Sequence, residues 1–443
     1  MPSKLNTTQQ LIFLVLLFLA VALPRLYYVN SFAVALPFWD QWDAEGDFLL
    51  RLWVENKLKF SDLLSFHNEH RIFPTRLLSL LLFEITDEWN NLTEARFNIL
   101  LASAIPILLI SVLLKDGALR EMRWFILSVL LAQFALPFPF ENLLVGFQSQ
   151  FYFLILFTLT SLILVTYRQE SGYAAAAVLV LCILSVTTMG SGFLTAVAVA
   201  GVCVLNWYTR STLSIRNLLL ILALIVIAVV GYFLVPQIPN HQVFRPQNIS
   251  QFINALGYIL SWPTADHQPA FLLWTPAVVM IPMLLFRKNM TRADLLMAGC
   301  FIWSFLQAGA IAYGRGQELT VVASRYTELF SLGLIANAWF SVRFMERYSS
   351  YRLRWLAVAF FLTFFYGHWT RFNPEFHYMK LNHEESLIQT HNVCMYLKTG
   401  DKSFLQKTGR EIPFPNPERL QMLLDNRTIR GMLPEPMRGC AGK

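Results

Sequence analysis

The segment Phe38–Phe48, FWDQWDAEGDF, places four acidic side chains and two tryptophans directly after an apolar stretch. Removing a carboxylate from water is costly, so each acid must face water, a cation or a polar ligand. Asp40 lies between Trp39 and Trp42, and a carboxylate against poorly hydrated aromatic surface holds a proton more readily, which suits a base that takes a proton from a hydroxyl. We therefore predict that Asp40 is the catalytic base, with Asp43 as the alternative.

The same four acids allow other roles. Asp40 and Asp43 are three residues apart, so on a helix they would share a face and could hold a divalent cation through their oxygens. Glu45 and Asp47 suit the first turn of a helix, where negative charge is stabilised, and we expect them to be solvated. Glu45 is also a candidate for substrate contact. An ion-coupling site of a transporter is a further interpretation, although such carboxylates usually lie at mid-membrane depth.

A second polar group is the pentapeptide HNEHR, which holds His67, Glu69, His70 and Arg71. Two histidines three residues apart can chelate a metal on a helix, but no Cys or Asp follows nearby as a third ligand, so we expect no metal site here. We predict instead that these four side chains contact a hydroxyl-rich substrate or form hydrogen bonds within their own loop.

Two arginines, Arg315 and Arg325, bracket a polar loop that precedes an apolar stretch. A guanidinium can bind two phosphate oxygens at once, so both are candidates to bind a lipid phosphate. Arg325 lies one residue before the apolar stretch and is the better candidate. The alternative for both is an interfacial position in which the guanidinium reaches out to water. The segment Pro236–Asn248 adds aromatic and polar groups of the kind on which sugars stack.

The composition indicates a membrane protein. Of the 443 residues, 56% are hydrophobic and only 14% are charged, against roughly 25% charged residues in soluble domains. The mean hydropathy is +0.48. Apolar stretches recur at the length needed for helices that cross a ~30 Å hydrocarbon core. The net charge of +7 comes from basic residues in short loops, so we expect the lipid bilayer, and no nucleic acid, as a partner.

We predict an all-α polytopic membrane protein with about 11 membrane-spanning helices. The candidate spans are Leu11–Tyr28, Arg96–Leu114, Met122–Leu136, Phe147–Tyr167, Ala174–Met189, Phe193–Trp207, Leu218–Val235, Ala270–Phe286, Ala293–Tyr313, Tyr326–Val342 and Trp355–His368. The first span lacks a small-residue cleavage site of the usual pattern, so we expect it to be retained as a helix.

Basic residues predict the orientation, because short loops rich in Lys and Arg mark the cytoplasm. Those of the alternate loops are Lys115, Arg120, Arg123, Arg210, Arg216, Arg287, Lys288, Arg292, Arg343, Arg347, Arg352 and Arg354. This places the N-terminus inside and residues 30–95 in one long external loop. Within that loop Pro74–Ile85 is apolar but shorter than the ~17 residues a spanning helix needs, so we expect it to lie in the membrane interface.

We expect the chain to divide into a transmembrane part, residues 1–370, and an external tail, residues 371–443. The tail shows little helical periodicity after Lys398, so we expect a small external cap of short helices and loops. Cys394 and Cys440, in the tail, are equally consistent with a disulfide and with two free thiols.

The order of these elements resembles the GT-C superfamily of integral membrane glycosyltransferases, which use polyprenyl-phosphate-linked sugars. The likeness covers residues 1–115 and rests on the first apolar helix, the acidic loop around Asp40, the histidine-containing stretch, the interfacial helix and the arginine-led second span at Arg96. The resemblance implies that an acid of the first external loop, Asp40 or Asp43, is the base and that external arginines such as Arg325 and Arg315 bind the donor phosphate.

The size and many-helix plan also resemble the bacterial and phage O-antigen glucosyltransferases, which modify lipopolysaccharide. This resemblance implies a multi-pass protein of the bacterial inner (plasma) membrane, with a cytoplasmic N-terminus and a periplasmic tail. It would transfer a sugar, with inversion, to O-antigen or another cell-surface glycan, and it needs no cofactor beyond the divalent cation possible at Asp40 and Asp43. The alternatives are a lipid-linked oligosaccharide flippase or other transporter, which would need charged residues inside its helices, and an O-antigen ligase, whose main external loop should come late in the chain.

Overall fold

The structure is a computed structural model that describes residues 6–119, 123–169, 171–210, 214–264, 269–317, 319, 321–347 and 351–441. Arg120, of the first basic loop, and Met122, of the third candidate span, lie outside the described residues. Every regular element in the described ranges is a helix, and an isolated β-bridge joins His67 to His70.

The helices are, in chain order, α1 (Thr7–Phe32), η1 (Trp42–Leu50), α2 (Arg51–Val54), α3 (Phe60–Leu63), α4 (Phe73–Thr86), α5 (Asn91–Lys115), α6 (Arg123–Ala135), α7 (Phe140–Leu144), η2 (Gly146–Gln148), α8 (Ser149–Tyr167), α9 (Gly172–Val186), α10 (Phe193–Arg210), α11 (Ile215–Phe233), α12 (Pro239–Gln242), α13 (Ile249–Ser261), α14 (Ala270–Phe286), α15 (Arg292–Arg315), η3 (Ser324–Phe330), α16 (Ser331–Arg347), α17 (Tyr351–Thr399), η4 (Lys402–Phe404), α18 (Pro417–Asp425), α19 (Arg427–Met432), α20 (Glu435–Arg438) and η5 (Gly439–Ala441). η1 is a π-helix and η2 to η5 are 3-10 helices.

Six helices among the described residues are long and apolar enough to cross a membrane, as in a multi-pass membrane protein. They are Thr7–Phe32, Asn91–Lys115, Gly146–Tyr167, Phe193–Arg210, Ile215–Phe233 and Arg292–Arg315. Three shorter apolar helices, Trp124–Ala135, Gly172–Val186 and Ala270–Phe286, coincide with further candidate spans. The last two candidate spans fall in η3–α16 and in the first half of α17.

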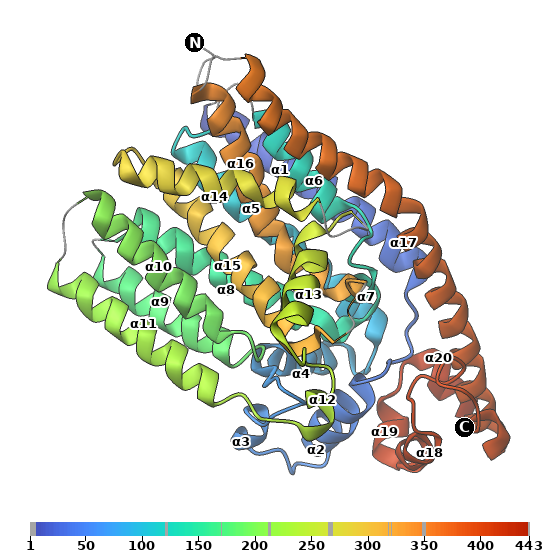
Figure 1. The fold of residues 1–443 in the computed structure, drawn as a ribbon. Coiled ribbons are helices and arrows are strands. Elements are labelled where there is room, and N and C mark those ends of the chain that lie inside the picture. Colours follow the sequence, from blue (N-terminus) through green and yellow to red (C-terminus); the bar gives the residue numbers. More distant parts are fainter. Residues whose placement is uncertain are drawn as a thin grey trace.

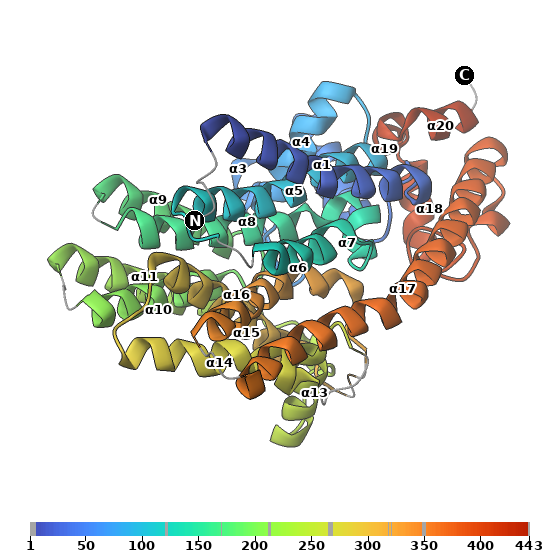
Figure 2. The same ribbon diagram turned by 90° about the horizontal axis from the view of Figure 1, so that it is seen from above.

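The helices pack into a bundle whose outer surface is apolar. Figure 2 shows α1, α5 and α8 on one side and α14 to α17 on the other. Apolar side chains such as Leu219, Val226 and Phe233 of α11 are exposed. Continuous exposed apolar surface is rare on a protein surrounded by water, so the bilayer accounts for this face.

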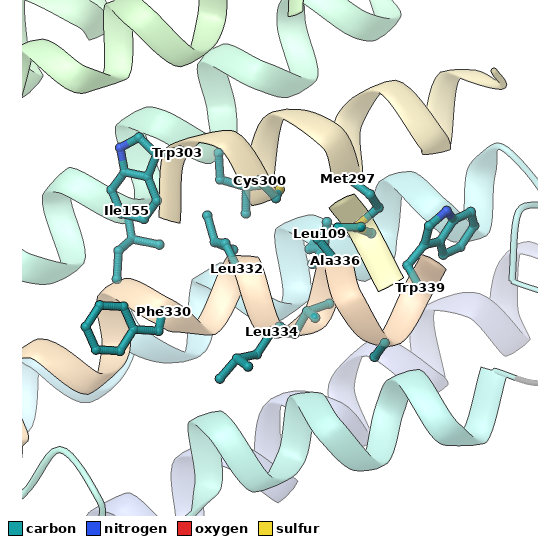
Figure 3. Packing of buried hydrophobic residues seen from close by; sticks show 14 of the residues in the cluster. Leu109, Ile155, Met297, Cys300, Trp303, Phe330, Leu332, Leu334, Ala336 and Trp339 are labelled. Carbon is teal, nitrogen blue, oxygen red and sulfur yellow. The ribbon is translucent and has the colours of Figure 1, made fainter. Parts of the chain in front are cut away.

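The core of the bundle lies between α15 and α16. Trp303 and Cys300 of α15 face Leu332 and Ala336 of α16, and all four side chains are fully buried (Figure 3). Gly333 allows this close approach, because a Cβ there would lie 2.6 Å from the Cβ of Ser304. α8 and α10 pack against α15, and α6 and α14 pack against α16.

The long helix α17 differs from the sequence prediction. The last candidate span was expected to end near His368, and the tail to begin at residue 371, but one continuous helix runs from Tyr351 to Thr399. At 1.5 Å per residue it is about 74 Å long, more than twice the thickness of the hydrocarbon core. Figure 1 shows it running along the side of the bundle to the end where α2, α4 and α12 lie beside α18 to α20. We call this the loop end.

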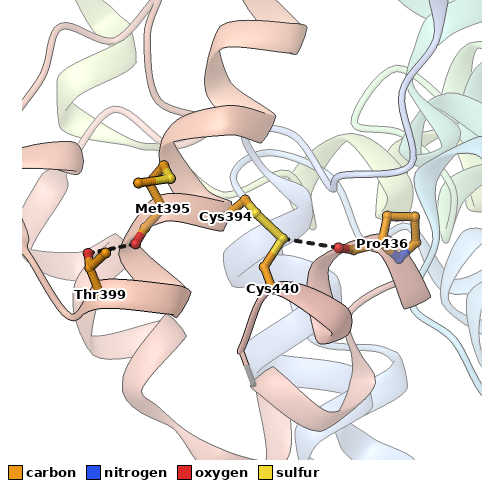
Figure 4. The surroundings of a disulfide bond; sticks show 5 residues. All are labelled: Cys394, Met395, Thr399, Pro436 and Cys440. Atoms are coloured by element: carbon orange, nitrogen blue, oxygen red, sulfur yellow. Dashed lines mark hydrogen bonds between the residues drawn. A yellow bond between two sulfur atoms is a disulfide. The ribbon is translucent and has the colours of Figure 1, made fainter. Parts of the chain in front are cut away.

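The cap, residues 400–441, consists of short helices and loops, as the sequence predicts. Its apolar side chains, among them Leu420 and Leu433, pack with Trp42 and Trp89 of the first loop. A disulfide joins Cys394 of α17 to Cys440 at the end of the cap (Figure 4). The pairing that the sequence left open is therefore a bridge, and it fastens the end of the cap to α17.

The segment predicted as an interfacial helix is the helix α4. Ile72 precedes it in the left-handed conformation, and Pro74 occupies its first turn, where proline is favoured. Leu77, Leu81 and Ile85 lie four residues apart and are exposed, so α4 presents an apolar stripe on its outer face.

Candidate functional site

Asp40 lies at the loop end, just before the π-helix η1, where Trp39 adopts a left-handed backbone conformation with φ of 51°. The backbone N–H of Trp39 donates to the carbonyl of Pro413 in the cap at 2.7 Å, which holds this turn in place. The Asp40 side chain is 43% exposed, and its Oδ2 lies 3.6 Å from Nε2 of His67. Asp40 is therefore open to solvent on one side and faces a histidine on the other, whereas the sequence suggested a poorly hydrated aromatic setting.

His67 and His70 lie on a tight turn and not on a helix. The N–H of His67 donates to the carbonyl of His70 at 2.7 Å, and the N–H of His70 donates to the carbonyl of His67 at 3.0 Å. Asn68 and Ile72 both have φ near +50°. This conformation is rare for a β-branched residue such as Ile72, and such strain gathers at functional sites. The strained residues flank the polar side chains that the sequence singled out.

His70 is partly buried and neutral at pH 7. Its Nδ1 accepts a hydrogen bond from the backbone N–H of Gly190 at 3.0 Å. Burial lowers the pKa of His70 to about 4, against the opposing charge of Glu69. A Cβ at position 190 would lie 2.8 Å from the carbonyl oxygen of Glu69, so a glycine there lets the α9–α10 turn approach the HNEHR turn closely. His70 thus anchors the loop to the bundle.

Glu69 joins two distant segments. Its Oε1 forms a short hydrogen bond with Nδ1 of His241 in α12 and lies 3.9 Å from Nη2 of Arg315 at the end of α15. Burial opposes ionisation of Glu69, but the hydrogen bond with His241 acts in the opposite direction, and the net effect is a lowered pKa. The guanidinium of Arg315 also lies over the ring of Phe244, 4.9 Å from its centre. The segment Pro236–Asn248 therefore covers this group.

Asp43 points to the cap. Its Oδ1 accepts hydrogen bonds from Nε and Nη2 of Arg419 at 3.0 and 2.8 Å, and Arg419 also binds Asp47 at 2.6 Å. Asp40 and Asp43 thus have different partners, His67 and Arg419. Among the described residues, no three His, Cys, Asp or Glu side chains form a group that could hold a metal ion.

The expectation that Glu45 is solvated is wrong. Only 1% of the side chain is exposed, because η1 packs against α4 and turns this residue inward. Gln41 Nε2 donates to Glu45 at 2.9 Å and to Glu94 at 3.0 Å. Asp47, which was also expected to be solvated, forms ion pairs with both Arg51 and Arg419.

The remaining predicted residues lie in other settings. Arg71 donates to the carbonyl of Leu64 at 2.8 Å and lies over the ring of Phe66, so both of these contacts are within its own loop. Arg325 is engaged by Glu141 of α7, which accepts from its Nη1 at 2.9 Å and from its backbone N–H at 3.0 Å. Arg325 keeps 39% of its side chain exposed.

The site therefore consists of Asp40, His67, Glu69, His241 and Arg315. Four of these were among the sequence candidates. His241 was not singled out, although it lies in the segment Pro236–Asn248, whose polar and aromatic groups had been noted. The sequence analysis also missed Arg419 and Glu94. Each is a charged residue on a helix, and only the contact with a partner far away in the sequence distinguishes it.

The chain matches no family model, no curated protein and no solved structure. The fold and site together describe a helical, multi-pass membrane protein with a polar, partly exposed side-chain group at one end of its bundle.

Proposed function

We propose that this protein is an integral membrane glycosyltransferase that moves a sugar from a polyprenyl-phosphate donor to a glycan acceptor. The observation that carries the proposal is the contact between Asp40 and His67, in which an exposed carboxylate faces a histidine on a strained turn. The apolar bundle beneath it suits a donor whose tail lies in the bilayer.

In the proposed reaction, Asp40 takes the proton of an acceptor hydroxyl, and the resulting oxygen attacks the anomeric carbon of the donor. The bond between that carbon and the phosphate oxygen breaks, and polyprenyl phosphate leaves with the electron pair. Attack from the opposite face inverts the configuration. His67 orients the Asp40 carboxylate, and an arginine stabilises the charge that grows on the leaving phosphate.

Arg315 and Arg325 both remain candidates for that arginine. Arg315 is supported by its position beside Glu69, which belongs to the same group of side chains as Asp40. Arg325 is supported by its exposed fraction, but Glu141 already occupies one side of its guanidinium. We therefore favour Arg315, with Arg325 second.

The proposal includes a location. With about 11 spans and basic loops in the cytoplasm, the loop end would face the periplasm of a bacterial inner membrane, and the acceptor would be O-antigen or a similar surface glycan. The exposed stripe Leu77, Leu81 and Ile85 supports a position of α4 in the membrane interface beside the donor.

A transporter of lipid-linked saccharides is the second candidate, because one charged pair lies inside the bundle. Arg25 of α1 and Glu328 of η3 are both buried and 2.6 Å apart. Reconstituted vesicles distinguish the two functions: a transporter moves the lipid-linked sugar across the bilayer intact, whereas a transferase releases polyprenyl phosphate.

The test of the proposal is the Asp40→Asn variant. Asparagine keeps the shape but cannot accept the proton, so we expect turnover to fall by about 10²–10⁴-fold. Purified protein would be given a panel of polyprenyl-phosphate hexoses with a glycan acceptor, and release of polyprenyl phosphate would be measured.

The matched control is Asp87→Asn, at an exposed left-handed position that asparagine adopts readily. It should retain parental turnover. If Asp40→Asn transferred sugar as well as Asp87→Asn does, Asp40 would not be the base. If Asp43→Asn alone were inactive while still folded, the base would be Asp43.

A further inference from the structure

Glu45 and Glu94 form a buried pair of carboxyl groups behind the site. Their side chains are 1% and 5% exposed, and Gln41 Nε2 donates to both. One amide nitrogen therefore binds an oxygen of each carboxyl group, which brings the two groups together. Two ionised carboxylates this close, with so little water, would repel strongly.

One oxygen of the pair has no partner. Oε1 of Glu45 is fully buried and accepts no hydrogen bond from any described residue. A buried carboxylate oxygen without a donor is costly, whereas a protonated carboxyl group donates a bond of its own. The pair is also tightly enclosed, because a Cβ at Gly146 would lie 2.2 Å from the Cβ of Glu94.

We propose that Glu45 and Glu94 form a proton-binding site in which a carboxylic acid donates to a carboxylate and the pair holds one proton. The ligand is the proton itself, and its release to solvent leaves both groups ionised. This proposal does not depend on the proposed enzymatic function.

The groups that face the pair come from several elements. Ser79 of α4 donates to Glu94 at 2.7 Å, and the Trp89 indole donates to Glu45 at 3.3 Å. Outside the pair, the charge of His67 acts on Glu45 and lowers its pKa. Arg76, also on α4, is occupied by the carbonyls of residues 62, 63 and 65. The donors around the pair are neutral, which favours retention of the proton.

The pKa of Glu45 supports proton release near neutral pH. Burial is the largest influence and raises this pKa to about 7, although the hydrogen bonds from Gln41 and Trp89 act in the opposite direction. Because the pKa is raised above its unfolded value of about 4.5, the pair stabilises the fold fully only below that unfolded pKa. That stability is lost as the pH rises through about 7.

The pair is also connected to Asp40. Gln41, which bridges the two acids, accepts a hydrogen bond from the backbone N–H of Phe38 at 3.0 Å through its own Oε1. Loss of the proton would therefore disturb the turn that carries Asp40. This consequence for activity rests on the proposed function, whereas the proton site does not.

Infrared spectroscopy of the purified protein tests the site directly. We expect the parent to show a protonated-carboxyl stretching band at acidic pH that disappears with a midpoint at about pH 7. Glu45→Gln and Glu94→Gln should each remove that band, because neither variant retains a pair. The control is Glu384→Gln, an exposed residue of α17, which should leave the band unchanged.

Thermal unfolding gives a second readout. The Tm of the parent and of Glu384→Gln should fall as the pH rises through about 7, and the Tm of Glu45→Gln should not show this fall. A parent without the infrared transition, or a Glu45→Gln variant with the parental pH dependence, would overturn the proposal. So would a parent whose alkaline Tm is restored by sodium but not by choline, since the pair would then bind a cation. A failed transferase assay would leave these results unaffected.

Discussion

At the scale of single residues, close packing around the acid pair depends on a glycine. Gly146 opens η2, and its N–H donates to Oδ1 of Asn91 at 2.7 Å while its carbonyl accepts from Asn98 at 2.8 Å. Both partners lie on α5, so the backbone of η2 lies directly against that helix. A side chain at this position would have to displace α5 or break these bonds.

Gly146→Ala is therefore expected to destabilise the protein. The added methyl group would overlap Glu94 and approach the carbonyl of Asn91 at 3.1 Å, and overpacking of this kind typically costs about 1–3 kcal/mol. Chemical unfolding in detergent measures the loss. The control is Gly172→Ala at the start of α9, where a Cβ meets nothing within 4 Å and alanine favours the helix. Equal stability of the two variants would show that η2 and α5 can move apart to accommodate the methyl group at little cost in stability.

At the scale of elements, Arg25 ties α1 to three other segments. Its guanidinium donates to Glu328 of η3 at 2.6 Å, to the carbonyl of Phe134 at the end of α6, and to the hydroxyl of Tyr152 on α8. Asn142 donates to the second oxygen of Glu328 at 2.9 Å. These bonds satisfy a charged pair that would otherwise be expensive to bury.

Removing one partner of this pair should be costly. Arg25→Met leaves Glu328 buried without its counter-charge, and we expect a loss of about 3–5 kcal/mol. The double variant Arg25→Met/Glu328→Gln removes both charges and should recover much of that loss. A double-mutant cycle by chemical unfolding in detergent measures the coupling. Additive losses in the two single variants would show that the pair does not stabilise the bundle jointly.

At the scale of the whole molecule, the cap and the first loop fold onto one another. Arg419 binds Asp43 and Asp47, Arg438 binds Glu88 at 2.9 Å, and the N–H of Trp89 donates to the carbonyl of Met432 at 2.7 Å. The cap therefore holds η1, and with it the turn that carries Asp40. The disulfide closes this arrangement by fastening the cap to α17.

Loss of the disulfide should loosen the cap and leave the bundle intact. The bridge spans a sequence separation of 46 residues, for which the chain-entropy model gives about 4 kcal/mol. We expect Cys440→Ser to make the cap more sensitive to limited proteolysis, with cleavage after residue 399 and an intact membrane part. Cys182→Ser, at a buried free cysteine, is the control. Equal proteolysis of the two variants would mean that noncovalent contacts alone hold the cap.

The sequence by itself determined the class of this protein and the position of most of its long helices. Hydropathy is a local property, so the apolar stretches that became α1, α5, α8 and α10 could be found without knowing any partner. The interfacial candidate became α4 for the same reason. The end of α17 was missed because its second half is polar, and hydropathy does not report a helix that leaves the apolar core.

Only the tertiary structure decided how the charged residues pair. The four acids of Phe38–Phe48 look alike in sequence, yet Asp40 faces His67, Asp43 binds Arg419 and Glu45 is buried beside Glu94. Arg419 is 376 residues from Asp43 along the chain. A carboxylate's role depends on its burial and its partners, and both are determined by segments that the fold brings together from far apart in the sequence.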